Sequence, residues 1–111
     1  MPTFKPWDVV KVPFPYTNRP VKEYRPALVV RIVEEGPGLL WVLMITSAEN
    51  RSWSGDVPIR ELKTAGLPAA SVVRTAKIAT IDAEAAHRLG SLATSERVAV
   101  AAALPVFAER M

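Results

Sequence analysis

Residues 26–45 of this 111-residue chain read PALVVRIVEEGPGLLWVLMI, two apolar runs separated by a segment rich in glycine and proline. Ala27–Val33 is rich in β-branched residues and too continuous for a surface strand, so we expect a central strand. Glu34–Gly38 has the composition of a turn, and Leu39–Ile45 is a second apolar run. The sequence therefore predicts a buried β-hairpin, which marks the chain as mainly β.

Polar residues flank this hairpin at the ends away from the turn. Arg25 precedes Pro26, which favours extended geometry for the arginine, while Thr46 and Ser47 follow the second run. Pairing of the two strands would bring Arg25 level with both hydroxyls. A guanidinium and two hydroxyl groups suit a phosphodiester. The same residues also fit a structural role, with Arg25 in a surface ion pair and the hydroxyls in turn bonds.

The segment before the hairpin predicts a strand and a loop. Asp8–Phe14 alternates as a half-buried strand does, with Val10, Val12 and Phe14 on one face and Val9 and Lys11 on the other. Pro13 and Pro15 cannot donate to a strand ladder, so we expect the strand to stop there. Residues 15–24 are rich in turn residues and cations, and we interpret them as an exposed, mobile loop able to cover a nearby site.

The remaining elements are short. We expect a strand at Val57–Ile59, then Ser71–Arg74 and Lys77–Ile81 as two strands or one strand broken near Thr75. A helix Ala83–Leu89 is predicted with Asp82 as N-cap and Gly90 as stop, and a last helix runs from Ser95 to about Leu104, kinked or ended by Pro105. These elements favour one domain, residues 1–111, built as a compact antiparallel barrel or sandwich with terminal helices.

Composition limits the possible settings. The chain has no cysteine, which excludes disulfides and thiolate metal sites and suits a reducing cytoplasm. Its start lacks the apolar core of a secretory signal, and Leu39–Ile45 is far shorter than the ~20 residues of a membrane helix. We expect a soluble cytoplasmic protein without contact to a membrane.

Charge is concentrated at the front of the chain. The net charge is +3, and the part through Arg31 holds six basic residues and two acids, 6 − 2 = +4. The remainder therefore carries −1. Such a front segment could attract a polyanion such as nucleic acid or an acidic protein segment. An ordinary solvated surface explains the same charges equally well.

Several kinds of catalytic site are excluded by the residues present. His87 is the single histidine and lies in a predicted helix, so a pair of histidines cannot serve as acid and base. The carboxylates, among them Asp8, Asp56 and Asp82, are scattered without metal-ligand spacing. No phosphate-binding glycine loop, nucleophile elbow or zinc motif is present. What remains is handling of phosphate by guanidinium and hydroxyl groups without metal or cofactor.

Five segments together resemble the PemK/MazF toxins of type II toxin–antitoxin systems. They follow in the order and spacing of that family, and the resemblance runs from about Asp8 to Leu92. The segments are DVVKVPFPYT (8–17), RPALVV (25–30), ITS (45–47), GDVPI (55–59) and GLPAASVVR (66–74).

The resemblance implies an SH3-like barrel of the PemK/MazF/CcdB kind, with small helices, and a homodimer. It implies ribosome-independent cleavage of single-stranded mRNA at short sequences, with no cofactor. The 2′-hydroxyl of the substrate attacks, leaving a 2′,3′-cyclic phosphate and a 5′-hydroxyl. A cognate antitoxin protein inhibits the toxin, and operator DNA is bound only through the toxin–antitoxin complex.

The resemblance also implies roles for residues. Arg25 is the catalytic arginine, Thr46 the hydroxyl partner at the scissile phosphate and Ser47 a supporting phosphate contact. Because a guanidinium stays protonated, Arg25 suits charge stabilisation better than base catalysis, so the base stays unassigned. Some members use a histidine in the first loop and an acid two residues after a later arginine. Here 15–24 lacks histidine and Ala76 replaces the acid, so Arg74 is an expected RNA contact.

Further substrate contacts are expected from loops. The candidates are Tyr16, Thr17, Arg19, Lys22 and Trp53. Tyr16 and Trp53 could stack on unpaired bases, or they could pack at the sheet edge. A second function stays open, because a sibling on the same barrel binds DNA gyrase as a poison and cuts nothing. The pairing of Arg25 with Thr46 favours the nuclease, since a gyrase binder needs no phosphate chemistry there.

Overall fold

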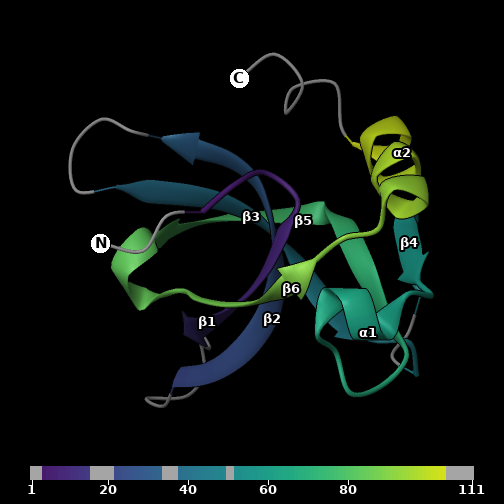
Figure 1. Ribbon diagram of the computed structural model, residues 1–111, viewed down its shortest axis with the longest axis horizontal. Helices are drawn as coiled ribbons and strands as arrows, with labels where there is room; N and C mark the ends of the chain where they lie inside the picture. Colours follow the sequence, from purple (N-terminus) through teal and green to yellow (C-terminus); the bar gives the residue numbers. More distant parts are fainter. Residues whose placement is uncertain (1–3, 16–21, 34–37, 50–51, 105–111) are drawn as a thin grey trace.

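The computed structural model describes residues 4–15, 22–33, 38–49 and 52–104, with backbone alone for 14, 15, 22 and 23. Six strands form one antiparallel sheet in the order β4-β5-β3-β2-β1-β6. Their bounds are Asp8–Pro15 (β1), Lys22–Val33 (β2), Leu39–Ser47 (β3), Asp56–Ile59 (β4), Ser71–Asp82 (β5) and His87–Ser91 (β6). The expected mainly-β fold with small helices is confirmed, with the sheet curved but not closed (Figure 1).

The predicted hairpin is confirmed and lies in the middle of the sheet. Val33 of β2 pairs with Leu39 of β3, and Ala27 pairs with Met44. The register shifts by one residue between Val29 and Arg31, and the paired region ends at Ala27 and Met44. Continued for two more residues along each strand, the register places Arg25 opposite Thr46. The apolar runs are continuous because β2 and β3 each have a strand on both sides and buried residues on both faces.

Strand β1 is longer and more buried than the sequence suggests. Pairing with β2 continues through Pro13 to Pro15, so the prolines do not stop the strand, and the expected loop 15–24 is partly strand. Strand β6 pairs only with Asp8–Lys11, so the later part of β1 is an edge of the kind that tolerates proline. Val9 is fully buried, so the strand is not merely half-buried there.

Strand β5 is one strand with a bulge, which decides between the two predicted possibilities. Arg74 pairs with Met44, yet Ile78 pairs with the adjacent Leu43. Residues 75–77 are therefore extra on the β5 side. The Thr75 hydroxyl in this bulge donates to the Gly55 carbonyl oxygen at 2.7 Å, which ties β5 to the turn before β4.

The predicted helix Ala83–Leu89 is wrong. Only a short 3₁₀ turn, η1 (Ala83–Ala85), forms there, and Asp82 makes no side-chain cap bond. The chain then becomes β6, which pairs with β1. The backbone groups of β1 on that side need partners, and this pairing outweighs the local helix preference of an alanine-rich segment. Gly90 therefore lies inside a strand, and His87 with it.

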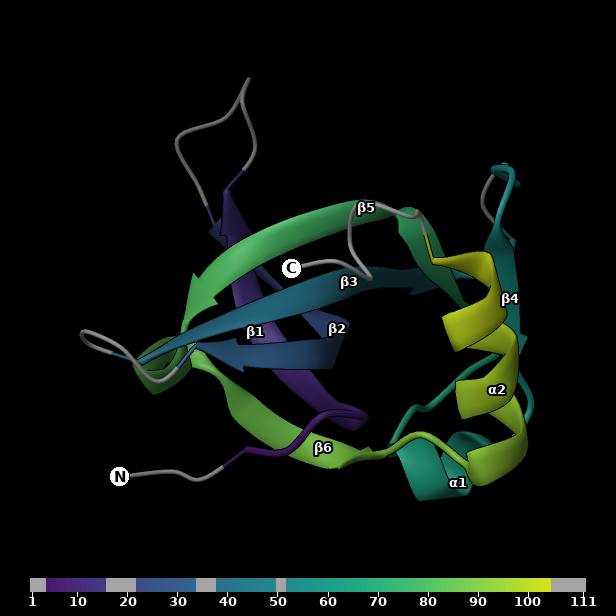
Figure 2. The same ribbon diagram turned by 90° about the horizontal axis from the view of Figure 1, so that it is seen from above.

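Two helices lie together with β4 at one end of the molecule (Figures 1 and 2). α2 (Thr94–Ala103) confirms the last predicted helix and packs against β4 and β5. α1 (Leu62–Ala65) was not predicted, and it packs against β6. Buried Glu96 of α2 accepts hydrogen bonds from the backbone N–H groups of Arg60 and Glu61, which joins α2 to the segment between β4 and α1.

Two apolar clusters make up the core. The larger one gathers residues from β1 to β5, α1 and α2, with Leu67 and Leu92: Val9, Leu28, Leu43, Ile45, Val57, Ile59, Ala65, Leu67, Val73, Leu92 and Val100. The smaller one lies on the other face of β1, β2 and β3 and includes Phe4 and Ala86. Within the described ranges, no helix is long and apolar enough to span a bilayer.

Candidate active site

A pocket of about 430 Å³ opens where β1, β2 and β3 meet the segment between α1 and β5. Its floor reaches the larger core cluster through Ile45 and Leu67. The wall combines apolar residues (Pro26, Ile45, Leu67, Pro68, Leu89) with polar ones (Lys11, Arg25, Thr46, Ser47, Ser71). An apolar hollow with a few polar groups at its rim has the usual character of a ligand site.

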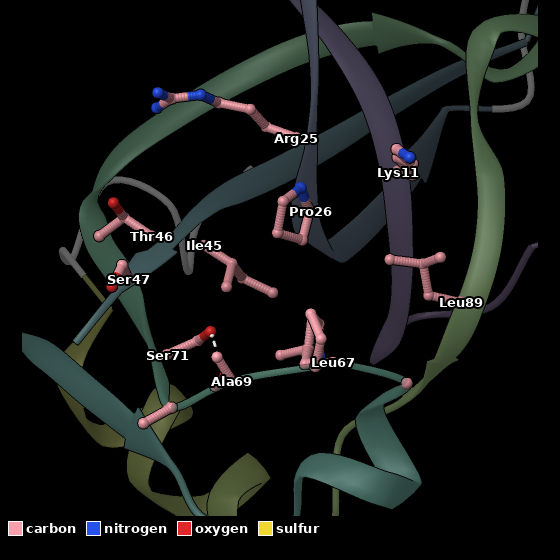
Figure 3. Close-up of a pocket in the computed structure, with 13 residues that line it drawn as sticks. Lys11, Arg25, Pro26, Ile45, Thr46, Ser47, Leu67, Ala69, Ser71 and Leu89 are labelled. Atoms are coloured by element: carbon pink, nitrogen blue, oxygen red, sulfur yellow. Dashed lines mark hydrogen bonds between the residues drawn. The ribbon is translucent and has the colours of Figure 1, made fainter. Parts of the chain in front are cut away.

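Arg25 and Thr46 both line this pocket. They come from adjacent strands, and continuing the β2–β3 register past its last pair, Ala27 with Met44, places both on one face of the sheet. Figure 3 shows both side chains on the same side of the pocket, across from Lys11 and Leu89. Arg25 is partly exposed and Thr46 is 9% exposed, so the guanidinium is the more accessible group.

Two serines lie beside them, one at the end of β3 and one at the start of β5. Ser47 is exposed, and its Oγ accepts a hydrogen bond from the Glu49 N–H at 3.3 Å. This is the turn bond of the structural reading, yet the hydroxyl keeps its own hydrogen for a ligand. Ser71, which pairs with Ser47, donates to the Ala69 carbonyl oxygen at 2.9 Å (Figure 3). Its hydroxyl thus holds the 69–71 wall in shape.

Lys11 and Leu89 are pocket residues that the sequence reasoning missed. Alternation along β1 places Lys11 on the same face as Val9, but nothing in the sequence relates that face to residues 66–71. Leu89 was assigned to a helix, whereas it lies in an irregular stretch of β6, where the register with β1 shifts. The ammonium of Lys11 adds a second cation at the rim, opposite Arg25.

Trp53, Asp56 and Arg74 form a cluster at the β4–β5 end. Arg74 Nε and Nη2 donate to the two carboxylate oxygens of Asp56 at 3.2 and 3.1 Å. The guanidinium carbon lies 4.2 Å from the centre of the Trp53 ring. Arg74 is only 8% exposed, so the expected RNA contact is buried beneath a tryptophan that is itself 44% exposed.

The pKa of Asp56 reflects this arrangement. Burial alone would raise the pKa of its carboxyl group, but hydrogen bonds from Arg74 and the Trp53 N–H, with the positive charge of Arg74, lower it below the ordinary value of 3.8. Asp56 is therefore ionised at neutral pH, and both of its carboxylate oxygens accept hydrogen bonds from Arg74 or Trp53. It does not supply a base to the pocket.

Some predicted contacts fall elsewhere. Tyr16, Thr17 and Arg19 lie outside the described residues, and Lys22 is described only as the first residue of β2. His87 pairs with Lys11 on β1, and it is not among the residues that line the pocket. Over the ranges given above, no three His, Asp or Glu side chains group to hold a metal ion.

Comparison with known proteins gives a family and a fold. The family model described as PemK-like, MazF-like toxin of type II toxin-antitoxin system matches residues 5–108. Among solved structures, Mycobacterium tuberculosis toxin MazF-mt6 is similar with a TM-score of 0.68 and 22% identity, over 87% of this chain and 91% of that chain. At that identity the likeness concerns the fold. No curated protein sequence matches this chain.

Proposed function

The chain belongs to the PemK-like, MazF-like toxins of type II toxin–antitoxin systems, and on that premise we propose that it is a metal-independent endoribonuclease. Its substrate is single-stranded mRNA, cut at a short sequence. The observation that carries the proposal is the convergence of Arg25 and Thr46, 21 residues apart in the chain, at the rim of one pocket. Ser47 and Lys11 add a hydroxyl and a cation for neighbouring phosphate oxygens.

The proposed reaction is an internal transfer at phosphorus. The 2′-oxygen of the substrate forms a bond to phosphorus, and the bond from phosphorus to the 5′-oxygen of the next nucleotide breaks. The products are a 2′,3′-cyclic phosphate and a 5′-hydroxyl. Arg25 stabilises the negative charge that grows on the phosphoryl oxygens, and Thr46 contributes a neutral hydrogen bond to the same group.

In this proposal solvent takes the proton from the attacking 2′-hydroxyl and supplies the proton to the leaving 5′-oxygen. Arg25 is a poor base, Asp56 is engaged elsewhere, and His87 on β6 does not line the pocket. With hydroxide as the base, the rate should rise with pH through neutrality, without the plateau that an imidazole base would give. Replacing His87 by alanine should leave the cleavage rate within about twofold, as a pH–rate profile of both proteins would reveal.

Cleavage of defined RNA tests the proposal directly. Purified protein is incubated with single-stranded RNA in EDTA, and the ends of the fragments are analysed. We expect cyclic phosphate and 5′-hydroxyl ends from the wild-type protein, and far fewer of these ends over the same time from Arg25→Ala or Thr46→Val. RNA that stays intact while the protein traps DNA gyrase complexes would replace this proposal with the non-catalytic one.

The family also suggests partners for the chain. We propose a homodimer inhibited by a cognate antitoxin, with operator DNA bound only by the toxin–antitoxin complex. Sedimentation of the purified chain at micromolar concentration should give twice the monomer mass of 12.1 kDa. Co-purification with the protein encoded next to it, and loss of RNA cleavage in that complex, would identify the antitoxin.

A further inference from the structure

The turn before β4 holds Trp53 rigidly by its backbone. The Trp53 N–H donates to Asp56 Oδ2 at 2.9 Å, and the Asp56 N–H donates back to the Trp53 carbonyl oxygen at 3.1 Å. Gly55 between them has φ +89°, which an L side chain rarely adopts, and its carbonyl oxygen accepts the Thr75 hydroxyl. The position of the indole therefore does not depend on a loose loop.

The ring of Trp53 is supported from one side by a fixed cation. The Arg74 guanidinium lies 4.2 Å from the ring centre and is oriented by both oxygens of Asp56. Such a contact between guanidinium and indole is favourable and directional. Since Arg74 is 8% exposed and Trp53 is 44% exposed, the surface offered to a ligand here is the aromatic ring rather than the arginine.

The cluster shares a sheet face with the proposed reaction centre. Arg74 pairs with Met44 on one side and with Asp56 on the other. Thr46 lies two residues beyond Met44 and so points to the same face, about 7 Å along the strand. A nucleotide adjoining a phosphate held by Arg25 and Thr46 would thus lie within reach of Trp53.

We propose that Trp53 is a stacking platform for an unpaired base next to the scissile linkage, and that Arg74 is a positioning residue acting through Trp53. This inference rests on the proposed ribonuclease function and deepens it. It replaces the expectation that Arg74 contacts RNA itself. Aromatic stacking of a single-stranded base changes affinity by about 5- to 150-fold on removal of the ring.

The chain offers a matched control in a second pair of the same type. Arg31 and Trp41 make a guanidinium–indole contact at 5.3 Å. Trp41 is five residues from Thr46 on β3, about 17 Å away, and points to the opposite face. Trp41→Leu and Arg31→Lys therefore repeat the chemical changes of Trp53→Leu and Arg74→Lys far from the site.

The experiment begins with an RNA oligonucleotide spanning a mapped cleavage site. Trp53→Leu should raise KM by about 5- to 150-fold with kcat changed less than threefold, while Trp53→Phe, which keeps an aromatic face, should recover most of the loss. Arg74→Lys should raise KM in the same direction because the bidentate support of the ring is lost. Trp41→Leu and Arg31→Lys should leave KM within about twofold.

A crosslinking measurement reports on stacking itself. The 2′-hydroxyl at the cleavage nucleotide is removed so that RNA binds without reacting, and 5-bromouridine is placed at each flanking position in turn. Irradiation should link one position to the peptide that contains Trp53, with lower yield in Arg74→Lys.

Each result has a distinct meaning. An unchanged KM in folded Trp53→Leu, or crosslinks that map only to other peptides while the wild-type protein cuts RNA, would overturn the platform and leave the ribonuclease standing. Absence of cleavage and of RNA binding by the wild-type protein would overturn both.

Discussion

At the scale of single residues, Arg25 and Thr46 owe their meeting to a register rather than to a motif. Each is ordinary by itself, and the β2–β3 register, continued past Ala27 and Met44, sets them opposite one another at a pocket rim. Ser47 shows how the structural and functional readings coexist, since its oxygen accepts a turn bond while its hydrogen stays available. What a polar residue can offer a ligand at this site depends on which of its donor and acceptor atoms already make hydrogen bonds within the protein.

Replacing Arg25 tests the charge-stabilising role. Arg25→Ala should lower the cleavage rate by about 10²- to 10³-fold, because it removes a preorganised charge at the phosphoryl group. The control is Arg31→Ala on the same strand, which should keep nearly full activity. Circular dichroism of both variants checks that each is folded. A folded Arg25→Ala protein with wild-type turnover would remove Arg25 from the mechanism.

Acid should weaken the Asp56–Arg74 pair in a defined direction. The folded-state pKa of Asp56 is lowered, so the pair contributes stability above the ordinary value of 3.8 and loses it as pH falls through the lower, folded-state value. Relative to Asp56→Asn, the wild-type protein should therefore lose its advantage in unfolding free energy below about pH 4. Urea unfolding of both proteins at neutral and acidic pH measures this, and a difference that does not change with pH would contradict it.

At the scale of elements, a close backbone approach joins α1 to β6 and forms one wall of the pocket. A Cβ on Gly66 would lie 2.1 Å from the Leu89 carbonyl oxygen, and one on Gly90 would lie 2.4 Å from that of Thr64. Neither backbone can move without the other element. The two glycines thus set where Leu67 and Leu89 face the pocket.

Alanine substitutions at Gly90 and Gly38 should separate the cost of a steric clash from the cost of backbone strain. Gly90 has no positive φ, so Gly90→Ala should destabilise through the clash alone, by at least about 2 kcal/mol. Gly38 has φ +84°, but a Cβ there would make only an ordinary contact, 3.7 Å from the Ala83 Cβ, and Gly38→Ala should cost about 1 kcal/mol. Chemical denaturation measures both values. Equal costs for the two variants would show that α1 and β6 can separate easily.

At the scale of the whole molecule, the structure shows where part of the positive charge of the basic front segment lies. Lys11 and Arg25, both from the basic front segment, stand on opposite sides of the pocket. Two cations facing one hollow attract a polyanion and orient it across the rim. The net charge of +3 does not reveal this, because it says nothing about where the charges meet.

The salt dependence of RNA binding should reveal whether Lys11 contacts a phosphate of the RNA. With RNA that lacks the reacting 2′-hydroxyl, Lys11→Met should weaken binding and reduce the slope of log K against log salt by about 0.7, the value for one phosphate on a single strand. Lys77→Met, at the exposed β5 bulge, serves as the control and should leave the slope unchanged. An unaltered slope in Lys11→Met would mean that this ammonium contacts no phosphate.

The sequence by itself determined the central hairpin and the last helix, and it placed Arg25 and Thr46 at the same end of that hairpin. Ala27–Val33 and Leu39–Ile45 are long apolar runs separated by turn residues, a pattern that favours a hairpin. Its register shifts by one residue between Val29 and Arg31, and the sequence does not predict that shift. The breadth of the resemblance, from the first strand to Leu92, likewise pointed to the family that the match over residues 5–108 establishes.

Only the tertiary structure decided the secondary structure of residues 83–91, the burial of Arg74 under Trp53 and the pocket wall made by Leu67 and Leu89. The backbone hydrogen bonds of an alanine-rich stretch can be satisfied either in a helix or in a strand. Here the stretch forms a strand because the backbone groups at the free edge of β1 need hydrogen-bond partners. The contact of Trp53 with Arg74 joins two residues far apart in the chain. Local sequence patterns do not predict which residues, distant in the chain, a curved sheet brings into contact.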